Sequence, residues 1–329
     1  MRKETIAILG AGSWGTAVAI HLATIGHHVM LWGHNPQHVT NMTKERCNLH
    51  YLPDAHFPPT LLPVASLDDC VEQASQVIIA VPSHAFASLL EQLKKPVQGL
   101  SWLTKGIDPA SHMLLSQLIA KKWGESYPIA VISGPSFARE VAHLLPTALV
   151  LAGNNPSFLK SMHAILHHGN MRVYMTDDII GVQLCGAVKN ILAIACGISD
   201  GLNYGANAKA ALITRGLAEM SRLGTRLGAR QETFMGLAGI GDLVLTCTDN
   251  QSRNRRFGLQ IGQGTSLAEA EKNIGQVVEG IHNAAQICWL AKKYTIEMPI
   301  CEEVNAVLQK NIHPKQAVIN LMSRPPRDE

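Results

Sequence analysis

One stretch near the start of the chain decides the fold: Thr5-Ile-Ala-Ile-Leu-Gly10-Ala-Gly12-Ser-Trp-Gly15-Thr-Ala-Val-Ala-Ile-His-Leu22. A short apolar run is followed by the spacing G-x-G-x-x-G and then by apolar positions at helical intervals. This order predicts a strand, a tight turn and a helix. In such a turn Gly10 makes the bend, Gly12 lets the backbone approach a pyrophosphate, and Gly15 lets the helix pack on the strand. A second apolar strand follows at 28–32, so the motif lies in a β-α-β unit, which favours dinucleotide binding over a plain glycine turn.

The first half of the chain alternates apolar runs with helical patterns. Helical patterns at Ala85–Leu93 and Met113–Lys122 separate several of the runs, and the proline-rich segment Asn48–Pro63 reads as a surface loop. Alternation of this kind predicts a Rossmann-type, doubly wound parallel sheet with helices on both faces. The predicted strands are Ile6–Leu9, Val29–Trp32, Val77–Val81, Leu100–Thr104, Ile129–Ser133, Thr147–Leu151 and Arg172–Tyr174.

After Thr176 the pattern becomes helical, and no further strand is predicted. The fold class is therefore an N-terminal α/β domain followed by an all-α domain. We place a dinucleotide-binding domain at residues 1–180 and a helical, substrate-binding domain at residues 181–329. The predicted helices are Asp177–Gly197, Ala206–Leu227, Leu267–Ile274, Gly280–Tyr294, Pro299–Gln309 and Pro314–Met322.

The composition argues against several classes of protein. The chain has 329 residues, which suits two domains, and a net charge of only +3, which gives no sign of a nucleic-acid-binding surface. Its 7 cysteines are scattered singly, as in a reduced cytoplasmic protein, and its 15 histidines fall in no metal-binding pattern. We expect no secretory signal, and no membrane span, because no apolar run approaches the required length of about 18 residues.

The end of the second strand bears on the cofactor. Enzymes of this fold usually carry a carboxylate there to hold the ribose 2′-hydroxyl, whereas this chain has Gly33-His34-Asn35. Without a carboxylate to repel a 2′-phosphate, the site should accept NADP, and His34 could bind that phosphate. His34 could equally do no more than end a strand, so both interpretations stay open.

Lys189 is an unusual residue in the first helix of the second half. Its neighbours three and four positions away are Cys185, Gly186, Leu192 and Ala193, all small or apolar. The ammonium group must therefore extend to solvent or line a cleft. Burial among such neighbours disfavours the charged form of a lysine, which suits proton exchange with an alcohol.

Further candidate residues occur in turns. Asp242 follows a glycine-rich loop and could cap a helix, contact a substrate hydroxyl or orient a lysine. The cluster Ser252-Arg-Asn-Arg-Arg256 has the composition of a phosphate site, although a solvated basic turn has the same composition. Lys105-Gly106 and Gly134-Pro-Ser136-Phe-Ala138 lie at predicted strand ends and offer a cation, backbone N–H groups and a hydroxyl.

Together these stretches resemble the bacterial-type NAD(P)-dependent glycerol-3-phosphate dehydrogenases. The matching motifs occur in the family's order and span almost the whole chain. They are Gly10-Ala-Gly-Ser-Trp-Gly15, Leu103-Thr-Lys-Gly106, Ser133-Gly-Pro-Ser-Phe-Ala138, Gly186-Ala-Val-Lys-Asn190, Gly239-Ile-Gly-Asp-Leu-Val-Leu-Thr-Cys247, Ser252-Arg-Asn254 and Val277-Val-Glu-Gly280.

The resemblance implies hydride transfer between NAD or NADP and the pair sn-glycerol 3-phosphate and dihydroxyacetone phosphate, with Lys189 as general acid and base. It implies a cytoplasmic homodimer that supplies phospholipid synthesis. The substrate positions of the family match Lys105, Gly134, Ser136, Lys189, Asp242, Ser252, Arg253 and Asn254. Its cofactor positions match Ser13, Trp14, His34, Lys105, Ala138, Arg253, Val277 and Glu279, in addition to Gly10, Gly12 and Gly15 of the turn.

Two other functions compete with this one. An enzyme of the same architecture could act on a β-hydroxyacid or a sugar-acid phosphate, but the Ser252–Asn254 cluster and Lys105 favour a small phosphate ester. A non-catalytic sensor of the dinucleotide would need neither Lys189 nor the arginine cluster.

Overall fold

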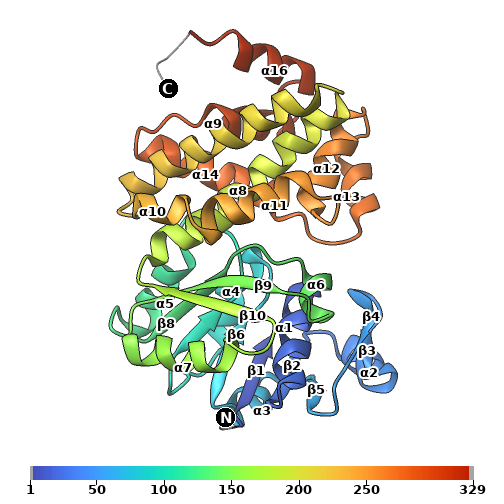
Figure 1. Cartoon of the computed structure of the whole chain (residues 1–329), viewed down its shortest axis with the longest axis vertical. Helices are drawn as coiled ribbons and strands as arrows, with labels where there is room; N and C mark the ends of the chain where they lie inside the picture. Colours follow the sequence, from blue (N-terminus) through green and yellow to red (C-terminus); the bar gives the residue numbers. More distant parts are fainter. Residues whose placement is uncertain (1–2, 326–329) are drawn as a thin grey trace. The chain divides into compact units, whose positions relative to one another are not determined.

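The computed structural model describes residues 3–325, which form two compact units (Figure 1). Unit 1 consists of the chain up to Lys105 together with Leu114–Val182. Unit 2 consists of Gly106–Met113 and the chain from Gln183 onward. The chain therefore passes from one unit to the other after Lys105, after Met113 and after Val182.

Unit 1 is built on an 8-stranded sheet with the strand order β10-β9-β8-β7-β6-β1-β2-β5. From β1 the chain moves outward to β2 and β5, and then returns to β6 on the other side of β1. This reversal is the topological switch point of a doubly wound fold, so the Rossmann-type prediction is confirmed. The strands are β1 (Thr5–Leu9), β2 (His28–Trp32), β5 (Leu61–Val64), β6 (Gln76–Ile79), β7 (Leu100–Trp102), β8 (Ile129–Ser133), β9 (Thr147–Gly153) and β10 (Met171–Thr176).

Helices connect these strands and cover the sheet. The inner strands are apolar and buried, as expected for a sheet with helices on both faces. The helices of unit 1 are α1 (Ser13–Thr24), α2 (Pro36–Glu45), α3 (Leu67–Glu72), α4 (Ser83–Gln92), α5 (Leu115–Trp123), α6 (Ala138–Ala142) and α7 (Pro156–Leu166).

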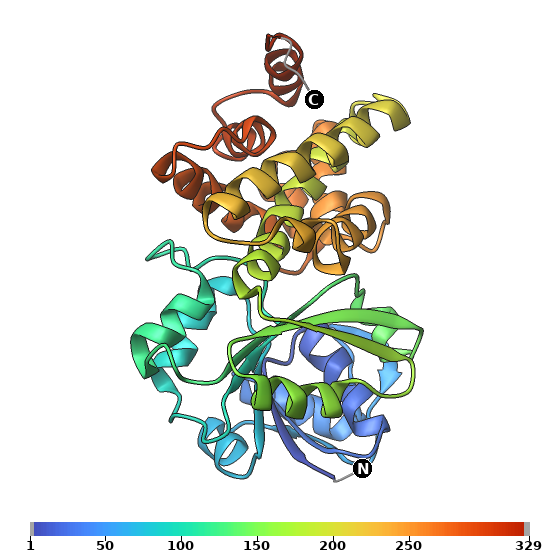
Figure 2. The same cartoon turned by 60° about the vertical axis from the view of Figure 1, so that its left-hand side comes forward.

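The sheet is not entirely parallel, which corrects the prediction. Strand β9 runs antiparallel to β8, while β10 runs parallel to β9. The connection from β8 to β9 contains only the 5-residue helix α6, which packs against α1 instead of crossing the sheet. Without a crossover helix, the chain reverses direction at that point. Figures 1 and 2 show β9 and β10 side by side, with α7 along them.

The prediction of a loop at Asn48–Pro63 is wrong. The segment contains all of β4 (Leu52–His56), most of β5 and one end of β3 (Cys47–Asn48), which pairs with β4 in a small antiparallel hairpin. Its prolines suggested a loop, but β5 is an edge strand, and an edge tolerates Pro63 because one side of the strand has no pairing partner.

Unit 2 is helical, as predicted. The glycine-rich loop is a short π-helical turn, η1 (Leu237–Gly241). The α-helices are α8 (Ile179–Gly201), which begins in unit 1, α9 (Gly205–Arg226), α10 (Gln231–Phe234), α11 (Asp242–Thr248), α12 (Arg253–Gly262), α13 (Leu267–Ile274), α14 (Glu279–Lys293), α15 (Pro299–Leu308) and α16 (Pro314–Met322). The sequence pattern did not predict α12, whose first turn is the basic cluster.

Helix α8 is the core of unit 2. Its length and composition would allow it to cross a membrane, although the sequence predicted no membrane span. However, 89% of its most apolar 18-residue stretch is buried inside the protein. It is therefore the central helix of a folded core, and Figure 1 shows it among the other helices of unit 2. Within residues 3–325, no other helix is both long enough and apolar enough to cross a membrane.

Candidate active site

The glycine turn lies at the switch point of the sheet. Gly10 has φ +130°, and a Cβ atom there would lie 2.7 Å from the backbone of Ala80, just after β6. A Cβ atom at Gly15 would lie 2.1 Å from the carbonyl oxygen of Gly10, so only glycine allows α1 to approach this closely. At Gly12, by contrast, a Cβ atom would meet nothing within 4 Å. The turn is therefore closely packed at Gly10 and Gly15 but open at Gly12, as backbone contact with a pyrophosphate requires.

The hairpin segment that was predicted as a loop supports this turn. The buried Asn48 side chain donates hydrogen bonds from Nδ2 to the carbonyl oxygen of Ala11 (3.0 Å) and to Oγ1 of Thr16 (2.8 Å). It fixes the backbone between Gly10 and Gly12. Sequence reasoning missed Asn48 because the contact joins residues about 35 positions apart.

The other predicted residues of unit 1 follow the carboxyl ends of parallel strands. Ser13 and Trp14 begin α1, and the exposed His34 follows β2, where the next residue, Asn35, caps α2. Lys105 follows β7 and is half-buried. Because β1, β2, β7 and β8 are parallel, these ends meet at one edge of the sheet.

After β8 the turn at Gly134 has φ +130°, and Ser136 Oγ donates to the carbonyl oxygen of Gly134 (2.9 Å). Ala138 is the first residue of α6. This turn belongs to the same edge of the sheet as the glycine turn.

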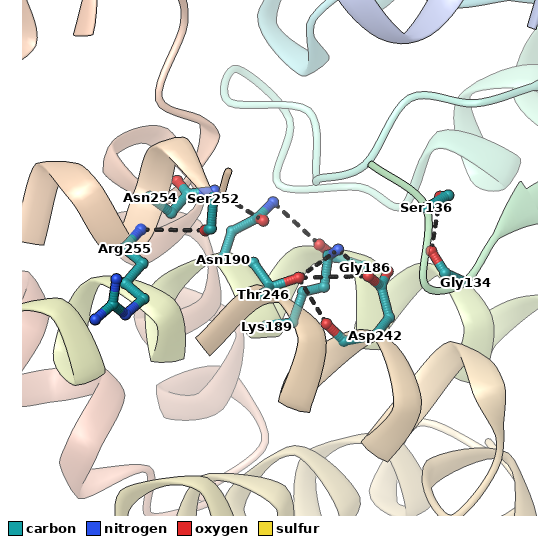
Figure 3. A network of polar contacts seen from close by, with 10 residues as sticks. All are labelled: Gly134, Ser136, Gly186, Lys189, Asn190, Asp242, Thr246, Ser252, Asn254 and Arg255. Atoms are coloured by element: carbon teal, nitrogen blue, oxygen red, sulfur yellow. Dashed lines mark hydrogen bonds and ion pairs between the residues drawn. The ribbon is translucent and has the colours of Figure 1, made fainter. Parts of the chain in front are cut away.

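Lys189 is buried in unit 2 and forms an ion pair with Asp242 (Figure 3). Only 8% of the lysine side chain and 1% of the aspartate side chain are exposed, so the alternative of an ammonium that extends to solvent is wrong. Nζ also donates to Oγ1 of Thr246 at 3.0 Å. Of the roles considered for Asp242, orientation of a lysine agrees with these contacts, and Gly241 occupies the cap position of α11.

The glycine loop delivers Asp242 to this position. Gly239 departs from helical geometry, with φ −88° and ψ −105°, and a Cβ atom there would lie 2.1 Å from the carbonyl oxygen of Phe234. Only glycine fits, and the π-helical turn then places Asp242 in the first turn of α11. Such turns often mark functional sites.

Thr246 is a site residue that sequence reasoning missed. It follows Asp242 by four positions on α11 and so lies on the same helix face. Its Oγ1 accepts from Lys189 and donates to the carbonyl oxygen of Asp242 at 2.6 Å. The spacing of an aspartate and a threonine four residues apart, after a glycine turn, was the available signal.

A second polar network joins three helices of unit 2. Asn254 of α12 donates from Nδ2 to Oδ1 of Asn190 on α8 (2.9 Å), and its Oδ1 accepts from the backbone N–H of Gly280 on α14 (2.9 Å). Asn190 follows Lys189 directly, so Asn254 is tied to the next residue along α8 (Figure 3).

The basic cluster at 252–256 is the start of α12, and not a solvated turn. Ser252 caps the helix by accepting from the N–H of Arg255 (3.2 Å). The Arg255 side chain is buried and bonds to Asp200 (2.5 Å) and to Asn250, so it has a structural role. Arg253 donates to Gln276 (3.2 Å), which precedes Val277.

Glycines bring α12 against α8. Methyl groups at Gly197 and Gly201 of α8 would lie 2.1 and 2.3 Å from backbone oxygens of α12, and at Gly258 and Gly262 they would lie 2.2 and 2.4 Å from backbone oxygens of α8. Small residues four apart on both helices allow the backbones to touch. This packing sets the start of α12 beside Lys189 and Asn190.

Val277 and Glu279 lie at the start of α14. Val277 is half-buried, and Glu279 is the first residue of the helix. The structure thus brings Lys189, Asp242, Asn254 and this helix start together within unit 2, whereas the glycine turn, His34, Lys105, Gly134, Ser136 and Ala138 belong to unit 1.

Comparisons with known proteins match the whole chain. A family model described as NAD-dependent glycerol-3-phosphate dehydrogenase N-terminus matches residues 5–159, and the corresponding C-terminus model matches residues 178–319. The chain is 68% identical to a glycerol-3-phosphate dehydrogenase (NAD(P)+) from Legionella pneumophila (strain Paris), with 100% of both chains covered. It is 50% identical to the protein of that name from Serratia proteamaculans, covering 99% of this chain and 98% of that one.

A solved structure is also similar. The crystal structure of glycerol-3-phosphate dehydrogenase from Coxiella burnetii has a TM-score of 0.94 and 50% sequence identity, covering 98% of this chain and 99% of that chain. The likeness extends over both units, each with its own fold.

Proposed function

Because the chain belongs to the NAD-dependent glycerol-3-phosphate dehydrogenase family, we propose that it interconverts sn-glycerol 3-phosphate and dihydroxyacetone phosphate with NAD or NADP. The observation that carries this proposal is the buried Lys189–Asp242–Thr246 cluster. A buried, oriented ammonium group is what the reduction of a ketone needs as a proton donor.

The dinucleotide binds to unit 1 in this proposal. The amides at the start of α1 face the pyrophosphate, because Gly12 leaves the approach open and a helix N-terminus favours anions. The bound nicotinamide supplies the hydride. Further cofactor contacts come from Ser13, Trp14, His34, Lys105, Ala138, Arg253, Val277 and Glu279.

Lys189 carries the proton. In the reducing direction a hydride reaches C2 of dihydroxyacetone phosphate, and Nζ gives its proton to the oxygen on C2 as the alcohol forms. In the reverse direction the neutral amine accepts the proton of that hydroxyl. Asp242 keeps the ammonium in place between turnovers, and Thr246 fixes its direction by accepting one of its hydrogens.

The substrate phosphate binds at the start of α12 in this proposal. Ser252 ends the preceding loop, and Arg253 and Asn254 begin the helix, so the amides and the helix dipole favour an anion there. Asn254 is held by Asn190 and Gly280, which leaves its orientation fixed. The family resemblance also assigns Lys105, Gly134 and Ser136 to substrate binding.

The family resemblance extends the proposal to the cell. We assign dinucleotide binding to a domain at residues 1–180 and substrate binding to one at 181–329. We propose a cytoplasmic homodimer that supplies glycerol 3-phosphate for phospholipid synthesis. The free, singly scattered cysteines support a reducing setting such as the cytoplasm.

An absorbance assay at the nicotinamide band tests the activity. The purified chain is mixed with NADH or NADPH and with dihydroxyacetone phosphate or a panel of carboxylate ketones. We expect turnover of dihydroxyacetone phosphate well above that of every carboxylate. Preference for a keto acid would point to the related enzyme class, and binding of NADPH without any turnover would point to a sensor.

A further inference from the structure

The segment Gly106–Met113 interrupts unit 1 but belongs to unit 2, and it begins directly after Lys105. It is a closed loop. The backbone N–H of Asp108 donates to the carbonyl oxygen of Met113 (3.1 Å), and the N–H of His112 donates to that of Asp108 (2.9 Å). Oδ2 of the buried Asp108 accepts from the N–H (2.8 Å) and the hydroxyl (2.6 Å) of Ser111. The loop therefore holds its own shape.

His112 attaches this loop to α14. Its imidazole stacks on the indole ring of Trp289, with ring centroids 4.2 Å apart and planes 12° apart. Its Nδ1 forms a hydrogen bond with Oε1 of the buried residue Gln286. Gln286 and Trp289 are three positions apart, so one face of α14 receives both contacts.

His112 has an unusual backbone conformation. Its φ is +57°, a left-handed conformation that few residues with side chains adopt, although histidine and asparagine adopt it more often than most. Backbone groups, Asp108 and Ser111 make the hydrogen bonds that close the loop, while the imidazole of His112 contacts α14.

We propose that His112 is a positioning residue, which fixes the loop on α14 and thereby fixes Lys105, the residue bonded to the start of the loop. This rests on the proposed function, in which Lys105 contacts both cofactor and substrate, and in which α14 begins with Glu279 beside Val277. The clasp, meaning His112, Gln286 and Trp289, holds the loop that follows Lys105 on α14, the helix that begins with Glu279, within unit 2.

In this proposal the clasp affects the binding of cofactor and substrate, and it does not involve the proton-transfer cluster. None of its three residues contacts Lys189, Asp242 or Thr246 among the interactions described above. Loss of the clasp should therefore raise KM for NADPH and for dihydroxyacetone phosphate, and leave kcat within about twofold. Stacking and one hydrogen bond correspond to an expected rise in KM of roughly 5- to 20-fold.

Two single variants of the full chain disrupt the clasp, one on the loop and one on α14. His112→Asn keeps a residue that tolerates the left-handed conformation but removes the ring, and Trp289→Leu removes the stacking partner without touching the loop. Each should raise both KM values, and the double variant should be no worse than the more affected single variant. Hydrogen exchange of the peptide containing residues 106–113 should accelerate in both. Lys292→Ala, an exposed change on the same helix, is the matched control.

The outcomes separate the clasp from the proposed function. Wild-type KM values in both variants, or a fall in kcat that follows a fall in melting temperature, would overturn the clasp while the activity of the unaltered chain stands. Absence of dihydroxyacetone phosphate turnover by the unaltered chain would instead overturn the proposed function. In that case faster exchange of residues 106–113 in both variants would still support the attachment of the loop to α14.

Discussion

Replacing Asp242 by Asn tests how the buried ion pair is held. Lys189 is 8% exposed and Asp242 is 1% exposed at the side chain, so the variant leaves an ammonium group without its charge partner in the core of unit 2. Breaking a buried pair in this way costs about 3–5 kcal/mol. In a domain of this size each kcal/mol corresponds to a shift of roughly 2–4 °C, so the melting temperature should fall by about 10 °C. Differential scanning calorimetry measures the shift.

Two companion variants make this result specific. Lys189→Met combined with Asp242→Leu removes both charges and keeps the volume, which is often neutral for stability, so most of the melting temperature should return without any activity. Lys44→Ala removes an exposed lysine 3.9 Å from Glu45 and should shift the melting temperature by less than about 1 °C. An unchanged melting temperature for Asp242→Asn would refute the reasoning, as would a double variant no more stable than the single one.

Three further predictions follow from the structure. Burial raises the pKa of Glu219 to about 7 from its usual 4.5, so the folded state holds this proton more tightly and stability should fall by up to about 3 kcal/mol as pH rises from 4.5 through 7. Glu219→Gln should make the free energy of unfolding, measured by urea unfolding, depend less steeply on pH. An unchanged pH dependence would rule out Glu219 as the group responsible. Thr246→Val removes a hydrogen bond to Lys189 and should lower kcat about 10- to 100-fold with little change in cofactor Kd, measured by steady-state kinetics and fluorescence titration. Gly258→Ala places a methyl group 2.2 Å from the carbonyl oxygen of Ile194, so α12 must move away from α8. KM for dihydroxyacetone phosphate should rise, whereas Gln263→Ala at the exposed end of α12 should leave it unchanged.

Local patterns predicted most of the architecture. The glycine spacing after β1 and the apolar runs gave the strands, and Pro299 and Pro314 gave the starts of α15 and α16, because a proline is favoured in the first turn of a helix. The glycine-rich loop before Asp242 and the apolar residues after it predicted the helix that follows, α11. These signals depend on neighbours within a few residues.

The features that the sequence did not predict depend on contacts between residues that are far apart in the sequence. The strand β5 was missed because its pairing with β2 is not visible from its own prolines. The direction of β9 was missed because a short connection beside α1 decides it. Thr246 and Asn48 were missed because their partners, Lys189 and the glycine turn, lie tens of residues away. Burial of Lys189 was left open for the same reason, since Asp242 supplies its counter-charge.

The most direct test of the account is turnover by Lys189→Ala with dihydroxyacetone phosphate and NADPH, measured together with NADPH binding. If the buried amine of α8 is the proton carrier, kcat should fall by about 10²–10⁴ while the Kd for NADPH stays close to that of the unaltered chain. Turnover at the original rate by a folded Lys189→Ala protein would contradict the account.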